Sequence, residues 1–228
     1  MEVILKDVWF SYDGLTYALR GINLGITEPG LYIIIGPNGA GKTTLLKIVS
    51  LMMRPTRGAV LINGRDFWGL GDEEKALIRR NIVFVHDRPI LLRGSVKYNV
   101  ELGLRIRGAK GGDVIHYYVS RYGLEGILNK PTHKLSAGQA KAVSIVRALA
   151  LRPPILVLDE PFTYLDEVRQ ELLLEDIKVR VKENVTTIIA THYMYKELLD
   201  ISSNIVELTY GEVIKFIRDF NEFPMRSS

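Results

Sequence analysis

The stretch LYIIIGPNGAGKTT, residues 31–44, decides the fold of this chain. Leu31 to Ile35 is a short apolar run, the pattern of a strand that is buried on both faces of a parallel sheet. A glycine-rich turn follows at once, and from Lys42 the apolar residues recur at helical spacing until near Pro55. Strand, glycine-rich turn and helix in this order predict a loop whose backbone amide groups cradle an anion.

Residues 36–43, GPNGAGKT, match the phosphate-loop pattern of glycine, four residues, glycine, lysine and threonine. The glycines let the backbone approach phosphate oxygens without a Cβ in the way. Lys42 is placed to reach the β and γ phosphates, Thr43 to ligate Mg²⁺, and Thr44 to bond a further phosphate oxygen. A chance match is the alternative, but the full pattern lies between a strand and a helix, where the chemistry needs it. The residues expected to bind the nucleotide phosphates are Gly36, Pro37, Asn38, Gly39, Ala40, Gly41, Lys42, Thr43 and Thr44.

A second apolar run, Ile155 to Leu158, ends in the acids Asp159 and Glu160. Ligands of parallel sheets bind beyond the carboxyl ends of the strands, so both carboxylates are expected beside the phosphate loop. Asp159 would complete the Mg²⁺ shell, and Glu160 would polarise a water molecule. Without the phosphate loop, a turn cap before Pro161 would explain the two acids equally well.

The composition is that of an ordinary globular chain, with 228 residues, 47% hydrophobic, 25% charged and a formal net charge of +4. The longest apolar stretches fall far short of the roughly 20 residues that a membrane-spanning helix requires. The first residues, MEVILKDVWF, show no signal-peptide pattern. The absence of cysteine excludes disulfides, thiolate metal sites and thiol nucleophiles. We therefore expect a cytoplasmic location.

Between the lysine and acid motifs lies LSAGQ, residues 135–139. With it the chain resembles the ATP-binding subunit of ABC transporters, whose signature is usually LSGGQ. The resemblance covers nearly the whole chain, because six motifs occur in the family's order. Tyr12 matches the aromatic residue that stacks on adenine, and Tyr17 is the alternative for that role. The other five motifs are Walker A at residues 36–44, the signature at residues 135–139, Walker B at residues 155–160, the D-loop at Leu165-Asp166 and the switch histidine at His192.

The family resemblance implies a fold class. The expected fold is α/β, a P-loop NTPase core with a mainly parallel sheet, an N-terminal antiparallel β subdomain and an inserted α-helical subdomain. We expect one ABC ATPase domain over residues 1–228, with a RecA-like core and β subdomain over about 1–86 and 152–228, and the helical signature subdomain over 87–151. Hydrophobic periodicity and turn-forming residues predict further strands at 3–10, 22–26, 58–62, 81–85, 187–190, 204–208 and 212–216. The same patterns predict a helix at 167–182 and breaks in the helical part at 108–112 and 123–132.

The resemblance also implies a mechanism that needs two copies. ABC ATPases pair head to tail, so the signature of one copy faces the γ-phosphate that Lys42 of the other copy holds. Glu160 and His192 would orient the attacking water, and Ser136 would in addition cap the helix that follows it. The signature residues expected at the partner's nucleotide are Ser136, Ala137, Gly138 and Gln139.

Four positions depart from the family pattern. His86 stands where most members carry a glutamine that reaches Mg²⁺ and the attacking water. Neutral imidazole can ligate a metal but its protonated form repels one, so His86 is a candidate catalytic and metal residue that predicts slower or more pH-sensitive hydrolysis. Ala137 replaces a glycine of the signature, and Tyr164 replaces a small residue of the D-loop. Ala140-Lys141-Ala142 stands where basic or amide residues are frequent.

The basic residues are unevenly placed. Residues 86–110 contain six basic and two acidic residues, a net of +4 that equals the charge of the whole chain. In the ABC family this stretch receives the coupling helix of the membrane subunit, whereas a solvated helical face is the plain alternative. Residues 94–108 resemble importer ATPases, including those that serve oxyanions such as tungstate. The expected partners are a second ATPase subunit, transmembrane permease subunits and, for an importer, an extracellular substrate-binding protein, at the inner face of the cell membrane.

Three alternatives remain open at the level of sequence. They are an exporter ATPase, a non-transport ABC ATPase acting in DNA repair or translation, and a nucleotide-binding regulator without turnover. In the second, the basic stretch would meet nucleic-acid phosphates. Such proteins usually split the motifs with a coiled coil or duplicate the domain, and neither pattern occurs in these 228 residues. Nucleic acid is therefore not expected as a partner.

Overall fold

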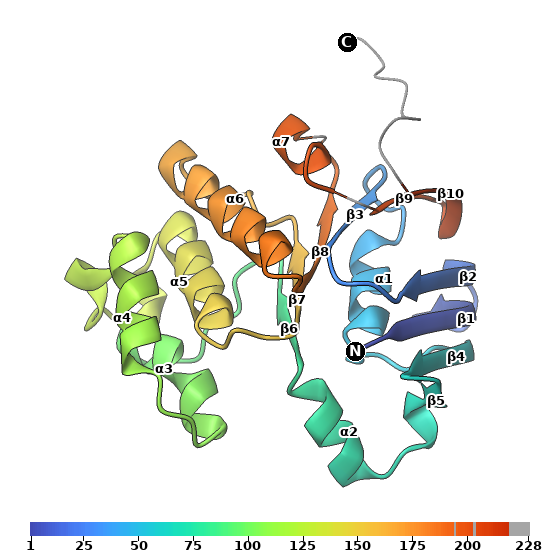
Figure 1. The fold of residues 1–228 in the computed structure, drawn as a ribbon, viewed down its shortest axis with the longest axis horizontal. Helices are drawn as coiled ribbons and strands as arrows, with labels where there is room; N and C mark the ends of the chain where they lie inside the picture. Colours follow the sequence, from blue (N-terminus) through green and yellow to red (C-terminus); the bar gives the residue numbers. More distant parts are fainter. Residues whose placement is uncertain (194, 203, 219–228) are drawn as a thin grey trace.

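Two β-sheets organise the chain in the computed structural model, which describes residues 1–193, 195–202 and 204–218 (Figure 1). The first sheet is antiparallel and has the order β2-β1-β4-β5, with β1 at Val3–Ser11, β2 at Tyr17–Ile26, β4 at Arg57–Ile62 and β5 at Arg65–Asp66. The second has the order β10-β9-β3-β8-β7-β6, with β3 at Leu31–Ile35, β6 at Ile82–Val85, β7 at Ile155–Asp159, β8 at Thr186–Thr191, β9 at Asn204–Thr209 and β10 at Glu212–Arg218. All its pairs are parallel except β10 with β9.

Strand β3 separates two hydrophobic cores, and all five of its residues are buried. Ile33 and Ile35 face a core shared with the helices, whereas Tyr32 and Ile34 face the other core, which contains helix α1 (Lys42–Val49) and the antiparallel sheet. Full burial of one such aliphatic side chain contributes about 1.5–3 kcal/mol. The continuous apolar run in the sequence is therefore explained, because both faces of this strand are covered.

The helices lie mainly on one side of the large sheet (Figure 1). They are α2 (Asp72–Arg79), α3 (Val96–Ile106), α4 (Gly112–Arg121), α5 (Ala137–Leu149), α6 (Glu167–Lys182) and α7 (Lys196–Leu199), with short 3₁₀ turns at Phe67–Gly69, Glu125–Ile127 and Thr132–Lys134. The predicted α/β class is confirmed, with its antiparallel N-terminal sheet, mainly parallel sheet and helical insertion. Across the described residues no helix is both long and apolar enough to cross a bilayer.

Two local features differ from the sequence expectation. Helix α1 ends at Val49 rather than near Pro55, because Leu51 takes a left-handed φ of 60°. The amide groups of Leu51 and Met52 then donate to the carbonyl oxygens of Ile48 and Lys47, a Schellman-type helix end that an apolar Leu-Met-Met sequence does not suggest. Helix α2 was not predicted; it contains no buried residue, and Ile78 packs partly buried against the core.

A buried polar link joins the segment after α4 to helix α6. The Tyr122 hydroxyl donates to Asp176 Oδ2 at 2.8 Å, and Arg121 Nε donates to Asp176 Oδ1 at 3.1 Å. Tyr122 and Asp176 are both buried. Because a buried carboxylate is costly without donors, this link constrains how the helical part packs on α6.

Removing the Tyr122 hydroxyl should therefore destabilise the fold. We expect Tyr122→Phe to lower the free energy of unfolding by about 1–3 kcal/mol, since Asp176 would lose one of its donors. Urea denaturation measures the change. The matched control is Tyr117→Phe, whose hydroxyl belongs to an exposed side chain and whose loss should leave stability within about 0.5 kcal/mol. Equal effects of the two substitutions would contradict the role of the link.

Candidate functional site

The phosphate loop lies between β3 and α1, and close packing explains two of its glycines, Gly36 and Gly41. A Cβ on Gly36 would lie 2.1 Å from the Leu208 carbonyl oxygen, and one on Gly41 would lie 2.6 Å from the Ala18 carbonyl oxygen. The turn between β9 and β10 closes on the same loop, because the Gly211 amide donates to the Ala40 carbonyl oxygen at 3.0 Å. A pocket of about 290 Å³ opens over the loop, lined by Ala18, residues 38–44, Asp87, Asp159 and Glu160.

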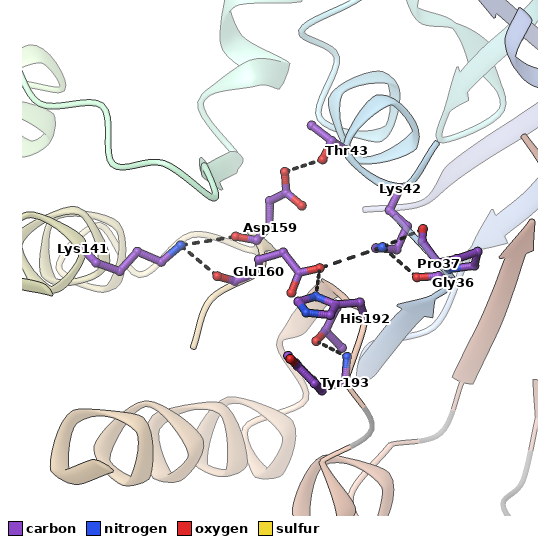
Figure 2. Close-up of polar contacts among 10 residues, drawn as sticks. Gly36, Pro37, Lys42, Thr43, Lys141, Asp159, Glu160, His192 and Tyr193 are labelled. Atoms are coloured by element: carbon purple, nitrogen blue, oxygen red, sulfur yellow. Dashed lines mark hydrogen bonds and ion pairs between the residues drawn. The ribbon is translucent and has the colours of Figure 1, made fainter. Parts of the chain in front are cut away.

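The Lys42 ammonium lies against the phosphate loop, where it is predicted to bind phosphates. Its Nζ donates to the carbonyl oxygens of Gly36 and Pro37 at 2.8 and 3.2 Å and lies 3.9 Å from Glu160 Oε1 (Figure 2). The side chain is nearly buried, so solvent screens its charge little. This cation is placed to meet an anion bound in the pocket.

Asp159 and Thr43 together offer oxygen ligands to a hard cation. The Thr43 hydroxyl donates to Asp159 Oδ2 at 2.8 Å, while Asp159 Oδ1 is buried and has no hydrogen-bond partner within the described chain. Burial raises the pKa of Asp159, the Thr43 hydroxyl opposes this, and the charges of Asp87 and Glu160 add to the rise. A buried carboxylate oxygen without a donor, beside a hydroxyl, fits Mg²⁺.

The described residues include no group of three or more His, Cys, Asp or Glu side chains that could hold a metal by themselves. Mg²⁺ does not need such a cage, because it is commonly bound through one or two carboxylates together with substrate phosphates and water. The set formed by Thr43 and Asp159 therefore fits Mg²⁺ that arrives with a nucleotide.

Glu160 and His192 meet because β7 and β8 are neighbours in the sheet. His192 Nδ1 lies 2.8 Å from Glu160 Oε1, and Figure 2 shows the carboxylate between His192 and Lys42. The Glu160 backbone is left-handed, with φ 42°, and its amide donates to the Ala190 carbonyl oxygen at 2.9 Å. An ionised carboxylate only accepts hydrogen bonds, so Nδ1 carries the proton in this contact.

The two candidate adenine-stacking tyrosines occupy different places. The Tyr12 hydroxyl lies 3.1 Å from Thr44 Oγ1, at the phosphate loop. Both rings pack edge-on against a neighbouring aromatic ring, Tyr12 against Phe10 and Tyr17 against Trp9, with 4.8 and 5.3 Å between the ring centroids, so the contact at the phosphate loop is what distinguishes Tyr12. Tyr12 is 62% exposed and so presents free ring surface next to the phosphate pocket. Aromatic rings stack on flat π systems, so the geometry favours Tyr12 over Tyr17.

The signature residues begin helix α5 and face the D-loop. Ser136 Oγ accepts from the Gln139 amide and Gln139 Oε1 accepts from the Ser136 amide, both at 3.2 Å, which is a capping box. A Cβ on Gly138 would lie 2.6 Å from the Tyr164 carbonyl oxygen. None of residues 135–139 lines the phosphate pocket of their own chain.

The end of β6 brings a residue to the pocket that the sequence argument did not single out. Asp87 lines the pocket, whereas the His86 ring packs edge-on against Phe84 with centroids 4.5 Å apart. Burial lowers the pKa of His86, and the positive charges of Lys47, Arg147 and Lys141 lower it further. Asp87 could have been identified from the sequence, because Asp87, like Asp159, is an acidic residue at the carboxyl end of a parallel strand.

Comparison with known proteins gives consistent matches. Residues 19–163 match the ABC transporter family. A putative ABC transporter ATP-binding protein of Pyrococcus furiosus is 35% identical over 216 residues, which cover 93% of this chain and 79% of the relative. The sulfate/thiosulfate import ATP-binding protein of Synechocystis is 33% identical over 218 residues, which cover 93% of this chain and 59% of the relative.

A solved structure extends the similarity to three dimensions. A dimeric ATP-binding cassette in a post-hydrolysis state, bound to ADP and phosphate, is 32% identical and superposes with a TM-score of 0.84 over 95% of this chain and 98% of its own. This chain therefore belongs to the ABC transporter family, as an ATP-binding subunit that hydrolyses ATP.

Proposed function

We propose that this ATPase powers the import of a substrate through transmembrane permease subunits, at the inner face of the cell membrane, with two ATPase subunits closing on ATP and Mg²⁺. The observation that carries the catalytic part is the position of the Glu160 carboxylate, 2.8 Å from His192 Nδ1 and 3.9 Å from Lys42 Nζ. The import relative from Synechocystis supports the direction of transport.

Each residue of the pocket has a separate role in the proposed hydrolysis of ATP. The loop amide groups and Lys42 bind the phosphates, and Tyr12 stacks on the base. Thr43 and Asp159 would hold Mg²⁺, which neutralises phosphate charge when it is bound. Glu160 accepts a hydrogen bond from the attacking water, and His192 Nδ1 fixes the carboxylate at 2.8 Å. Phosphoryl transfer depends mostly on positioning and charge neutralisation, so these roles are sufficient.

The signature belongs to the active site of a second copy in this proposal. Residues 135–139 lie away from their own phosphate pocket, and the amino end of α5, with its partial positive charge, is available to an opposing γ-phosphate. The dimeric cassette with ADP and phosphate supports this pairing. Ser136, Ala137, Gly138 and Gln139 are then nucleotide contacts across the dimer.

The surface proposed for the permease lies beside the end of β6. A groove of about 550 Å³ is lined by Pro89, Leu91, Arg93, Thr132, His133 and Ala140. Ile90 and Leu92 are 56% and 46% exposed next to it, and the basic side chains of Arg88 and Lys97 are exposed nearby. Apolar and basic side chains together suit a short helix of a partner protein better than they suit nucleic-acid phosphates.

The base assignment predicts a large loss of activity in Glu160→Gln. The amide keeps the size of the side chain but is a poor proton acceptor, so we expect ATP hydrolysis to fall by about a hundredfold or more while ATP affinity changes less than about threefold. Steady-state phosphate release and equilibrium ATP binding measure the two effects. Glu167→Gln, the same change on the exposed start of α6, should be neutral. Undiminished turnover in Glu160→Gln would reject Glu160 as the base.

The proposed role of His86 predicts a pH effect with a defined sign. Burial and three nearby cations lower the His86 pKa from its usual 6.5, so the ring is neutral at pH 7 and becomes charged only at more acidic pH. A charged ring would repel Mg²⁺, so hydrolysis should fall as the pH drops through that lowered pKa.

A pair of variants separates His86 from its neighbour. His86→Gln should remove this acid limb from the pH–rate profile, whereas Asp87→Asn should keep the limb and lower activity at every pH. An unchanged profile in His86→Gln would show that His86 does not reach the reacting groups.

If the permease docks in the groove beside the end of β6, a substitution there should weaken assembly with the permease and leave basal ATP hydrolysis unchanged. Arg93→Glu reverses a charge in the groove, and we expect it to reduce co-purification with the permease subunits by at least about tenfold, since like charges and lost contacts both oppose docking. Hydrolysis by the free chain should stay within about twofold. Arg54→Glu, an equal charge change at another exposed position, is the control. Equal co-purification of the two variants would place the permease elsewhere.

A further inference from the structure

Lys141 is a charged residue in the protein interior that the mechanism above does not use. It lies in the first turns of α5, and its side chain is 0% exposed. Burial lowers the pKa of Lys141 to about 8, while Asp87, Asp159 and Glu160 oppose that shift. Lysine is almost never fully buried unless its charge is compensated.

The Lys141 ammonium is surrounded by backbone carbonyl oxygens from the ends of two strands. Its Nζ lies 3.0 Å from the oxygens of His86 and Asp87, after β6, and 3.3 and 3.0 Å from those of Asp159 and Glu160, at the end of β7. Strands β6 and β7 are parallel neighbours, so their carboxyl ends lie side by side. An ammonium has only three protons for these four oxygens, so it cross-links the two strand ends by charge as well as by hydrogen bonds.

One of the four carbonyl groups belongs to the proposed catalytic base. Glu160 has a left-handed backbone, a conformation that a side chain with a Cβ disfavours and that its surroundings must hold. Its amide is held by the Ala190 carbonyl oxygen at 2.9 Å, and its carbonyl oxygen is held by Lys141 (Figure 2). The direction of the Glu160 carboxylate towards Lys42 and His192 depends on these two anchors.

A purely structural role would not require a charge at this position. Desolvating an ammonium is costly, and a neutral side chain of similar volume often gives an equal or higher stability. Three of the residues whose carbonyl groups Lys141 holds, Asp87, Asp159 and Glu160, line the phosphate pocket. The buried charge of Lys141 therefore lies directly beside the residues that form the phosphate pocket.

We propose that Lys141 is a positioning residue for ATP hydrolysis, which fixes the left-handed Glu160 backbone and the end of β6 against the signature helix. The inference rests on the proposed role of Glu160 as the base. Lys141 does not line the phosphate pocket. It acts through Glu160, so it should affect the rate of the chemical step and leave the binding of ATP nearly unchanged.

Lys141→Met tests this proposal in the full chain, because it keeps the length and bulk of the side chain and removes every donor. We expect kcat for ATP hydrolysis to fall by at least about tenfold, with KM and the dissociation constant for ATP within about threefold of the wild type. Ser144→Ala is the matched control. Its hydroxyl is also buried in α5, but it donates only to the Lys141 carbonyl oxygen, at 2.8 Å, so kcat should stay within twofold.

Should Lys141→Met fail to fold, Lys141→Gln takes its place, and its two amide donors should retain part of the lost kcat. A second arm combines Lys141→Met with Glu160→Gln. If Lys141 acts through Glu160, the double variant is no slower than Glu160→Gln alone. A kcat within twofold of wild type, a parallel loss of ATP binding, or a full additional loss in the double variant would overturn the inference. Normal turnover in Glu160→Gln itself would instead reject the base assignment, which keeps the two failures distinguishable.

Discussion

The site depends on the register of three neighbouring parallel strands. In the order β3-β8-β7, Ile35 pairs with Thr191 and Asp159 pairs with Ala190, so the three strands end at one edge of the sheet. The residues just beyond that edge include the phosphate loop, His192 and Glu160. A slip of one residue in either pair would turn every side chain of a strand to the opposite face. Burial on both faces of β3 opposes such a slip, because each face packs against its own core.

Register alone does not direct the carboxylate of the proposed base, Glu160, and a second constraint acts on its backbone. Glu160 and Tyr164 both have positive φ, at 42° and 70°, within one short segment after β7. Such conformations cost about 1–3 kcal/mol each and persist only where the surroundings hold them. Ala190 holds the Glu160 amide and Lys141 holds its carbonyl oxygen, while the Tyr164 carbonyl oxygen lies against Gly138 in the signature. The proposed base, the D-loop and the signature helix are thus one connected unit.

The parts of this unit that could be predicted from the sequence are those that a pattern of neighbouring residues indicates. Strand β3 and helix α6 have the predicted bounds, because the pattern of neighbouring residues indicates both elements. Glu160 was found because it follows an apolar strand, and His192 because the chain resembles the ABC family, in which a histidine follows a strand. Lys141 was noted only as a departure from the family pattern, since its partners lie 18 to 55 residues away and are backbone atoms that no side-chain pattern reveals. The end of α1 was misplaced for a similar reason, because Leu51 enters a left-handed conformation that the sequence favours only weakly.

The charges around the pocket support the proposed binding of a divalent cation there. Asp87, Asp159 and Glu160 line a pocket of about 290 Å³ that must also receive a polyphosphate. Lys42 offsets part of this negative charge from the pocket side, and Lys141 offsets part of it from behind the strand ends. Burial is the main cause of the raised pKa of Asp159, the charges of Asp87 and Glu160 add to the rise, and Asp159 Oδ1 has no donor within the described chain. Phosphates would worsen this imbalance, whereas phosphates that arrive with Mg²⁺ would relieve it, so nucleotide and cation should bind as one unit.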